Sequence, residues 1–396
     1  MTIDLMDANG VPSVEGGWST QIRTVPNGVI NHVKQGFRVH GSGVLDVDGG
    51  YVPESVLWRS RPLMVAPPVP ENPAYQPGRW LWGGKLLDHF GHFLIESTGR
   101  LWALDHLKGH MDGIVFVPEG DLSGESEPPE LKAFQRVFFD LLGITLPIKV
   151  LTRPTRFERL EVPGQGFGTG LMAAGTAQFR DFIQNRFGAT VAASGSELLY
   201  ISRSQLGRDL GGIVGEARLE RYLSECGYEI YHPQNHSLTE QIARYKAARQ
   251  VVSVDGSALH LFAMVGTPHQ RIAMIRRRLG TTPEGIVRHL RAFTQTDPLV
   301  LDAITQNWVR SDRKHADNFS YGELDFAALG KELSRNGFVP AGLKWRPLST
   351  ARAAMAIQRI AAWFAPEAIS FNAVPVAAKQ PEKRSERNLA RKGARP

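Results

Sequence analysis

Cysteine is nearly absent from this sequence, since Cys226 is the only one among 396 residues. A single thiol excludes an intrachain disulfide framework, and so few cysteines are typical of a reducing compartment. We expect Cys226 to be a packing residue at the end of a helix. The sequence also lacks a run of about 18 apolar residues, the length that a transmembrane helix needs. Because its first ten residues lack the basic flank and apolar core of a signal peptide, we expect a cytoplasmic location.

Basic residues only slightly outnumber acidic ones, 46 Lys and Arg against 39 Asp and Glu, which gives a formal net charge of +7. Most of the excess lies in residues 373–396, where seven basic and two acidic side chains give +5. The rest of the chain carries only about +2, which does not indicate the basic face of a nucleic-acid-binding protein. We therefore expect no nucleic-acid partner, and a disordered basic tail over residues 373–396.

The composition, with 42% hydrophobic and 21% charged residues, is that of a globular protein long enough for two domains. The expected fold class is α/β. Hydrophobic periodicity and glycine-rich breaks predict four regions before the tail: an irregular β region at 1–80, an N-terminal α/β domain at 81–190, a Rossmann-like domain at 195–295, and a helical extension at 296–372.

The stretch from Leu198 to Val265 alternates short apolar runs with amphipathic ones. The expected strands are Leu198–Ser202, Tyr228–Tyr231 and Val251–Val254, and the expected helices are Val214–Cys226, Leu238–Ala248 and Ser257–Met264. Strands separated by single helices imply right-handed crossovers and a parallel sheet. Such a sheet binds ligands at the carboxyl ends of its strands.

Two of these strand ends carry residues suited to an anion. Arg203 directly follows the first strand, and Arg208 lies in the next loop. Asp255 and Gly256-Ser257 follow the third strand, where glycine and the free amide groups of a helix start let a phosphate approach closely. Helix capping or pairing with Glu216 is the alternative for the arginines. Sugar contact, catalysis and a helix-start role all stay open for Asp255.

In the first half, the spacing of Leu94, Leu101 and Leu104 predicts a long helix over Leu86–Leu107. Four polar residues share one face of this helix or its next turn: Asp88, His92, Glu96 and Arg100. A base that deprotonates a hydroxyl is usually a histidine or a carboxylate, so we expect His92 or Glu96 to be the base and the other to orient it. Surface ion pairs, or a zinc site that includes His89, are the alternatives.

Short patterns in these two stretches resemble the glycosyltransferase 61 family, of the bacterial capsular or surface polysaccharide type. The matching residues, in chain order, are Asp88 through Glu96 with Arg100, Ile201-Ser202-Arg203, Arg208, Glu216, Glu240-Gln241-Ile242, and Asp255 through His260. The resemblance spans about Trp80 to Ile275. Each pattern is short, but their order and spacing together are fairly specific.

The resemblance implies two Rossmann-like domains that face a cleft, a GT-B-like architecture. It implies an inverting, metal-independent glycosyltransferase that moves a sugar from a nucleotide-sugar donor, UDP-linked, to a saccharide or glycan hydroxyl in surface polysaccharide biosynthesis. No cofactor is expected beyond this donor. Together with the residue chemistry, it assigns catalytic roles to His92, Glu96 and Asp255, nucleotide binding to Arg203, Arg208, Glu240, Gln241, Gly256, Ser257, Ala258 and His260, and the acceptor side to Asp88, His89 and Arg100.

Two other function classes stay open. Asp255, Phe93 and Glu96 replace residues that are usual in the family, which leaves room for a non-catalytic nucleotide- or glycan-binding module. A nicotinamide dehydrogenase would need a G-x-G-x-x-G fingerprint, and the glycine-rich stretch Gly164–Gly170 misses that spacing. We expect this stretch to be a mobile loop at the cleft.

Two further segments have alternative interpretations. Asp46-Val47-Asp48 has the form of a metal-binding Asp-x-Asp motif, but Gly49-Gly50 follows at once, which favours a hairpin turn. The amphipathic segment Thr350–Phe364 predicts a helix that packs onto the first domain or, with the basic tail, lies on a membrane surface. Peripheral membrane contact therefore stays open.

Overall fold

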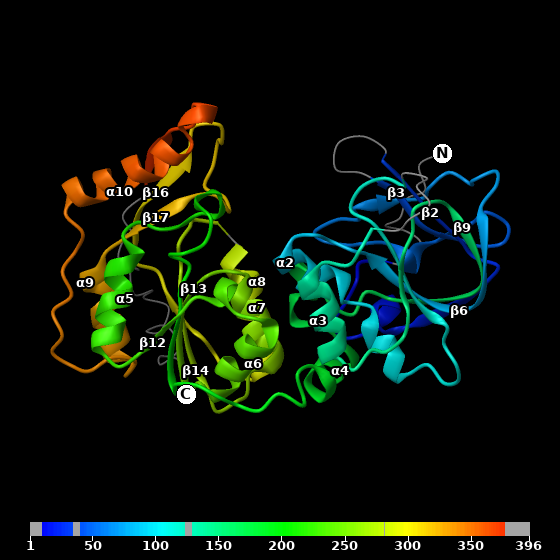
Figure 1. Cartoon of the computed structure of the whole chain (residues 1–396), viewed down its shortest axis with the longest axis horizontal. Helices are drawn as coiled ribbons and strands as arrows, with labels where there is room; N and C mark the ends of the chain where they lie inside the picture. Colours follow the sequence, from blue (N-terminus) through cyan, green and yellow to red (C-terminus); the bar gives the residue numbers. More distant parts are fainter. Residues whose placement is uncertain (1–9, 35–39, 123–128, 281, 377–396) are drawn as a thin grey trace, which may run out of the picture.

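The computed structural model describes residues 10–34, 40–122, 129–280 and 282–376. Within them the chain folds into two α/β lobes that lie side by side (Figure 1). The α/β fold class is confirmed. Residues 377–396, most of the expected basic tail, lie outside the described residues.

In the described part of the chain, the N-terminal lobe is built on a nine-stranded mixed sheet of order β4-β3-β2-β9-β6-β7-β8, with β1 paired to β9 and β5 to β3. Its strands are β1 (Ile22–Pro26), β2 (Val29–Lys34), β3 (His40–Leu45), β4 (Tyr51–Val52), β5 (Met64–Val65), β6 (Ala74–Lys85), β7 (Gly113–Val117), β8 (Ile148–Val150) and β9 (Thr155–Pro163). Strands β6, β7, β8 and β9 are parallel, whereas β1 and β2 join β9 antiparallel. The sheet therefore crosses the boundary expected at residue 80.

Short helices cover this sheet on the side of the second lobe (Figure 1). They are α2 (Phe90–His92), η3 (Phe93–Ser97, π-helical), η4 (Leu101–Asp105), α3 (Ala133–Leu141) and α4 (Ala177–Arg186), with the 3-10 turns η1 (Gly17–Thr20), η2 (Pro53–Ser55) and η5 (Gly170–Ala174) elsewhere in the lobe. Apolar side chains of α3 and α4, among them Phe138, Phe139, Phe179 and Phe182, are buried.

The expected long helix over Leu86–Leu107 is wrong, because the segment breaks into α2, η3 and η4. The Thr98 hydroxyl donates to the Leu94 carbonyl at 2.7 Å, a local bond that competes with regular helix. Gly99 lies against the Phe167 carbonyl, where a Cβ atom would stand only 2.4 Å away. The π-helical turn matters for the site because such turns re-aim side chains and are frequent at functional positions.

The second lobe contains the strand–helix alternation expected for residues 198–265. Its parallel sheet has the order β12-β10-β13-β14-β15, which is a doubly wound order. The strands are β10 (Leu198–Ile201), β12 (Glu229–Tyr231), β13 (Gln250–Val254), β14 (Arg271–Ile275) and β15 (Leu299–Leu301). The helices are α5 (Glu216–Glu225), α6 (Leu238–Ala247), α7 (Ser257–Val265) and α8 (Thr282–Thr294), with the turns η6 (Arg208–Leu210) and η7 (Pro233–Asn235). Half-buried Cys226 ends α5, as predicted.

The expectation of a helical extension over 296–372 is wrong in part. Strand β15 joins the parallel sheet, and a four-stranded sheet of order β11-β17-β16-β18 follows. Its strands are β11 (Gly212–Ile213), β16 (Ile304–Arg310), β17 (Tyr321–Leu324) and β18 (Phe371–Pro375), and the helical elements of this region are α9 (Phe326–Arg335), α10 (Thr350–Trp363) and η8 (Ala365–Glu367). Helix α10 packs through Ala353 and Ile357 on this sheet, so it covers the second lobe and not the first.

Two short motifs are settled by their contacts. Asp46 Oδ1 accepts hydrogen bonds from the amides of Asp48 and Gly50 at 3.1 and 2.7 Å, so the Asp-x-Asp segment is a hairpin turn, as predicted. The glycine-rich stretch is not an open loop: residues 164–168 are buried, and a Cβ atom on Gly164 would stand 1.8 Å from the Trp18 carbonyl. The expectation of a mobile cleft loop is therefore wrong.

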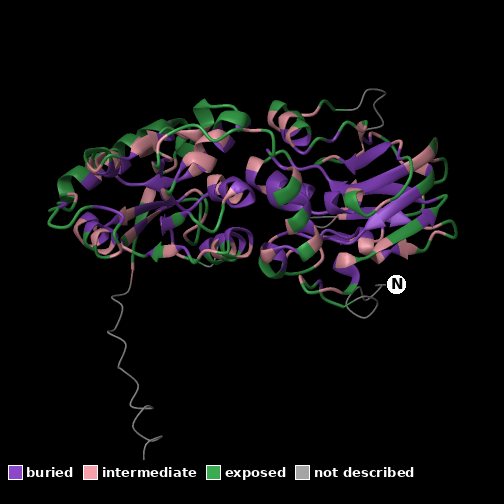
Figure 2. Cartoon of the chain, turned by 90° about the horizontal axis from the view of Figure 1, so that it is seen from below, coloured by how far each residue is buried: buried purple, intermediate pink, exposed green. Residues whose placement is uncertain are grey.

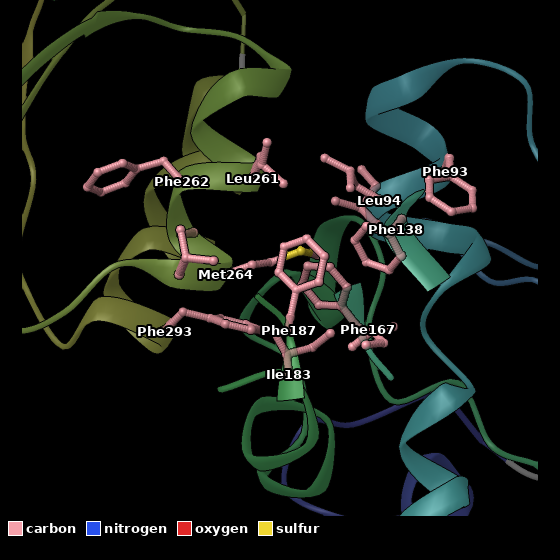
Figure 3. Packing of buried hydrophobic residues seen from close by; sticks show 14 of the residues in the cluster. Phe93, Leu94, Phe138, Phe167, Ile183, Phe187, Leu261, Phe262, Met264 and Phe293 are labelled. Carbon is pink, nitrogen blue, oxygen red and sulfur yellow. The ribbon is translucent and has the colours of Figure 1, made fainter. Parts of the chain in front are cut away.

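One apolar core runs through both lobes. It joins residues of the first lobe, such as Leu94, Phe138 and Phe187, to residues of the second, such as Leu261 and Phe293. Figure 3 shows these side chains converging from α7 and α8 on one side and from the α2–α4 region on the other. Buried residues lie in the elements of both lobes on either side of this junction (Figure 2). The lobes are thus joined by packed side chains along part of their junction.

Candidate functional site

Arg203 and Gly256 lie next to each other at the carboxyl edge of the second lobe's sheet. Arg203 follows β10, and Gly256 precedes the first residue of α7. A Cβ atom on Gly256 would stand 2.6 Å from Nη1 of Arg203, and Nη2 donates to the Leu210 carbonyl at 2.9 Å. The first amide groups of α7 have no acceptor within the helix. The structure thus brings together a guanidinium and a helix N-terminus, two groups that bind anions.

Asp255 is wholly buried, and two arginines face its carboxylate. Its Oδ1 lies 3.4 Å from Nε of Arg277 and 3.3 Å from Nε of Arg278, while Oδ2 accepts the Arg277 amide at 2.9 Å. Both arginines follow β14, next to β13 in the sheet. This geometry favours a structural role in which Asp255 holds the two arginines, and this role differs from the sugar contact, catalysis and helix-start role left open by the sequence.

A second buried carboxylate, Glu216, organises the chain around Arg203. Its Oε1 accepts the hydroxyls of Tyr200 and Ser202 at 2.9 and 3.1 Å and the Arg203 amide at 2.8 Å. Burial raises the pKa of Glu216, and these donors and the Arg203 charge only partly offset that effect. Glu216 therefore fixes the turn that presents Arg203, and it does so through the Arg203 backbone amide.

Arg203, Arg277 and Arg278 form a cationic cluster, which we call the arginine cluster. Burial lowers the pKa of each guanidinium, and for Arg203 and Arg277 the neighbouring arginine charges lower it further. Three mutually repelling cations held by two buried carboxylates create a site that an anion stabilises. Arg276-Arg277-Arg278 was not among the predicted site residues, although this run follows a strand at the same sheet edge as Arg203.

Across the junction, His92 and Glu96 are hydrogen-bonded through one turn. Nδ1 of His92 lies 2.8 Å from Oε2 of Glu96, whose side chain is 0% exposed. Nε and Nη2 of Arg59 donate to the two Glu96 oxygens at 2.5 and 2.9 Å. Burial raises the pKa of Glu96, but the hydrogen bonds from His92 and Arg59 and the Arg59 charge outweigh it, so the net shift is downward.

Glu96 is therefore held ionised, and it orients the His92 ring in the way that a carboxylate orients a catalytic histidine. With its proton on Nδ1, the ring leaves Nε2 to accept a proton. Arg59 was not predicted as a site residue, because no local sequence pattern marks a loop arginine that pairs with a residue 37 positions away.

The acceptor-side residues expected beside the His92–Glu96 pair do not form one group in the structure. Exposed Asp88 pairs with Lys132 at 3.2 Å. His89 caps α2, its Nδ1 accepting the His92 amide at 3.5 Å. Arg100 is buried and turns away from His92, donating to the carbonyls of Glu54, Val56 and Pro163. The expectation that Arg100 shares the His92 face is wrong because the π-helical turn η3 and Gly99 change the helical phase.

Several expected nucleotide-binding residues make contacts within the chain. Nη1 of exposed Arg208 donates to the Arg359 carbonyl at 2.8 Å. Glu240 forms a capping box with Ser237, and Gln241 donates to the carbonyls of Pro233 and His236. His260 meets His289, with 2.9 Å between their Nδ1 atoms. Glu240 and Gln241 thus have helix-start roles in α6, whereas Arg208 links η6 to α10.

The two faces meet where α2 touches α7. A Cβ atom on Gly91 would stand 2.3 Å from Oγ of Ser257, so glycine permits the close approach, with Ala258 in the same helical turn. Burial and the charges of His92 and Arg203 lower the pKa of His89. Burial lowers the pKa of His260 to about 4, and the charges of His92 and Arg278 add to the effect. Side chains of both lobes therefore share one electrostatic environment.

A zinc site built on His89, His92 and Glu96 does not form in the structure. Among the described residues, the group of metal-ligating side chains close enough to share an ion is His32, His40 and Asp121. Glu96 is already occupied by Arg59 and His92.

In the described residues no helix is long and apolar enough to cross a membrane.

A comparison with curated proteins finds no match for this chain. A family model does match, and the matched range contains both His92–Glu96 and Arg203–Gly256. Residues 90–272 are thus similar to the family described as Glycosyltransferase 61.

Proposed function

We propose that this protein is a glycosyltransferase that moves a sugar from a nucleotide-sugar donor, UDP-linked, to a saccharide or glycan hydroxyl. The observation that carries the proposal is the position of the arginine cluster and the α7 N-terminus opposite the His92–Glu96 pair. One side suits a leaving diphosphate, and the other suits a base that deprotonates the attacking hydroxyl.

On the donor side, glycosyl transfer releases a nucleoside diphosphate whose negative charge must be stabilised. The Arg203 guanidinium and the first amides of α7 converge beside Gly256. Charge-assisted hydrogen bonds from a guanidinium contribute about 1.5–3 kcal/mol each, and a helix N-terminus about 0.3–2 kcal/mol. Fixed cations of this kind support a metal-independent reaction at the diphosphate.

On the acceptor side, His92 accepts the hydroxyl proton at Nε2 while Nδ1–H donates to Glu96. The acceptor oxygen forms its bond to the anomeric carbon as the bond to the diphosphate oxygen breaks. Attack from the face opposite the leaving group inverts the configuration of that carbon. A single base and a single leaving-group site support this direct displacement, and the two lobes play the parts of a GT-B-like pair.

The proposed setting is surface polysaccharide assembly at the cytoplasmic side of a membrane. Helix α10 supports peripheral contact because Met355 and Trp363 are 49% and 51% exposed, and Arg352 and Arg359 lie on the same helix. Basic amphipathic helices of this kind bind anionic lipid surfaces.

The test is the affinity for UDP of Arg203→Ala, measured by calorimetry against the wild type. Because the variant loses at least one charge-assisted hydrogen bond, we expect its dissociation constant to rise about 10- to 100-fold or more. The matched control is Arg249→Ala, since Arg249 precedes β13 at the opposite edge of the sheet and its side chain is 76% exposed. Equal affinity in the wild type and Arg203→Ala would refute the donor site. UDP binding without sugar transfer across a donor panel would indicate a non-catalytic binding module.

A further inference from the structure

Three metal-ligating side chains gather at the rim of the first lobe's sheet, away from the arginine cluster. They come from β2 (His32), β3 (His40) and the loop after β7 (Asp121). One ligand atom of each lies within 4.8 Å of the others. The two imidazole rings are stacked, with centroids 5.2 Å apart and an interplanar angle of 15°. Two paired strands that are consecutive in the chain and a loop about 80 residues further on thus present ligand atoms to one point.

His32 is the residue whose surroundings most directly indicate a missing ligand. Its side chain is 0% exposed, and within the described residues neither ring nitrogen makes a hydrogen bond of ordinary geometry. The Gly120 backbone is a weak hydrogen-bond partner of the ring, which leaves the ring incompletely satisfied within the described residues. Buried polar groups are nearly always satisfied by a hydrogen bond, a water or an ion. An imidazole placed between another imidazole and a carboxylate has the surroundings of a metal ligand.

We propose that His32, His40 and Asp121 bind a divalent transition-metal ion of the zinc class. Two neutral imidazoles and one carboxylate form a three-ligand set that zinc accepts, with a fourth position open to water. Zinc bonds of about 2 Å bring tetrahedral ligands to about 3.3 Å from one another. The side chains therefore close by up to about 1.5 Å around the ion, from their separations of at most 4.8 Å. Exposed Asp121 can make this movement without disturbing the core.

The charges around the site are mixed. Nζ of Lys85 lies 3.4 Å from Nε2 of His40, and this ammonium opposes a second cation. Asp121 and Glu119 are both within electrostatic range of Lys85 and oppose its charge. The Asp121 carboxylate is therefore the ligand whose negative charge favours the ion, and Asp121→Asn removes that charge while keeping the shape of the side chain.

The proposed metal site is linked electrostatically, through Lys85, to the residues around Glu96. Lys85 ends β6 and is in electrostatic range of Arg59 and Glu96. A bound ion would hold β2 and β3 against the loop after β7. This proposal goes beyond the glycosyl-transfer proposal and does not depend on it, because the donor diphosphate is met by arginines in the other lobe.

The experiment measures Zn²⁺ and Co²⁺ binding, each metal alone, to chelator-treated full-length protein without an affinity tag, in the absence of nucleotide. We expect one ion per chain by calorimetry, a tetrahedral Co²⁺ spectrum, and a higher melting temperature with Zn²⁺ because the ion binds the folded state. Asp121→Asn should weaken binding at least 10-fold, and His32→Gln should abolish it.

The matched control is His110→Gln, whose histidine side chain is 83% exposed and pairs with Asp112. It should bind the ion as the wild type does. If His32→Gln does not fold, Asp121→Asn still decides, since the Asp121 side chain is exposed. No bound ion in the wild type, or equal affinity in Asp121→Asn and His110→Gln, would overturn the proposal, whatever the outcome of the UDP measurement.

Discussion

Glu96 is an enclosed carboxylate with a cation or a hydrogen-bond donor on each oxygen. Its side chain is 0% exposed, and Arg59 and His92 approach it from two elements. A buried carboxylate without partners would be driven to protonate. Here the partners reverse that effect and hold the pKa of Glu96 below its ordinary value. Glu96 is therefore a positioning residue for His92, and this role requires that its carboxylate be ionised.

Replacing Glu96 by glutamine keeps the shape and removes the charge. We expect Glu96→Gln to leave UDP affinity unchanged, because Glu96 is in the lobe opposite the arginine cluster. Turnover should fall on the order of 10²-fold, since general-base catalysis contributes about 10²–10⁴-fold and the ring loses its orienting partner. Initial rates at saturating donor and acceptor measure this split between binding and turnover.

Glu96→Gln also tests the role of the Glu96 charge through the pH dependence of the free energy of unfolding. The pKa of Glu96 is lowered in the folded state from its ordinary value of 4.5, so its ionised form stabilises the fold above that pH. This stabilisation is lost as pH falls below 4.5 and through the lowered folded pKa. Denaturant titrations should show a shallower acid loss of unfolding free energy in Glu96→Gln than in wild type. Parallel curves, with a changed KM for donor, would contradict the positioning role.

At the scale of elements, the start of α7 decides the donor side. Gly256 has a φ of 172°, an extended backbone that any residue adopts. What restricts the position is space, because a Cβ atom would meet Nη1 of Arg203 at 2.6 Å. The contact is with the end of a flexible side chain, so a substitution moves the guanidinium and spares the helix.

We expect Gly256→Ala to weaken UDP binding about 10-fold while changing the free energy of unfolding by no more than about 1 kcal/mol. Calorimetric titration with UDP and urea unfolding measure the two effects. Gly285→Ala, in α8, is the control, since a Cβ atom there meets nothing within 4 Å. A large loss of stability with unchanged affinity would mean that Gly256 serves the turn alone.

At the scale of the whole molecule, the two lobes share side chains of one core. Phe293 of α8 is 1% exposed, and its ring centroid lies 5.6 Å from that of Phe167 and 6.1 Å from that of Phe179. Both partners belong to the first lobe. A cavity at Phe293 removes contacts from each lobe. The amides of both lobes should therefore lose protection from hydrogen exchange together.

We expect Phe293→Ala to destabilise the protein by about 3–5 kcal/mol and to raise amide hydrogen exchange in both β7 and β13. Leu333→Ala is the comparison, because Leu333 is buried in a core cluster made only of second-lobe residues. It should raise exchange chiefly in the second lobe. If Phe293→Ala also affects the second lobe alone, the lobes unfold independently and the shared core is not cooperative.

The regular elements of the second lobe were predictable from residues 198–265. Fully buried parallel strands are short apolar runs, and helices begin at recognisable caps such as Ser237 with Glu240. The segment from Leu86 to Leu107 was not predictable in this way, because its breaks depend on Gly99 packing against a distant carbonyl. Strands β15 to β18 were also missed, since short, half-exposed strands have weak periodicity.

Local pattern by itself determined the α/β class, the alternation of β10 to α7, the hairpin turn at Asp46 and the placing of Arg203 and Gly256 at one sheet edge. These follow from side-chain periodicity and turn chemistry, which act over a few residues. Only the tertiary structure decided that Arg59 holds Glu96, that Asp255 holds Arg277 and Arg278, and that His32, His40 and Asp121 meet. Ion pairs and shared ligands join residues far apart in the chain, and their energies depend on burial, which exists only once the lobes have packed.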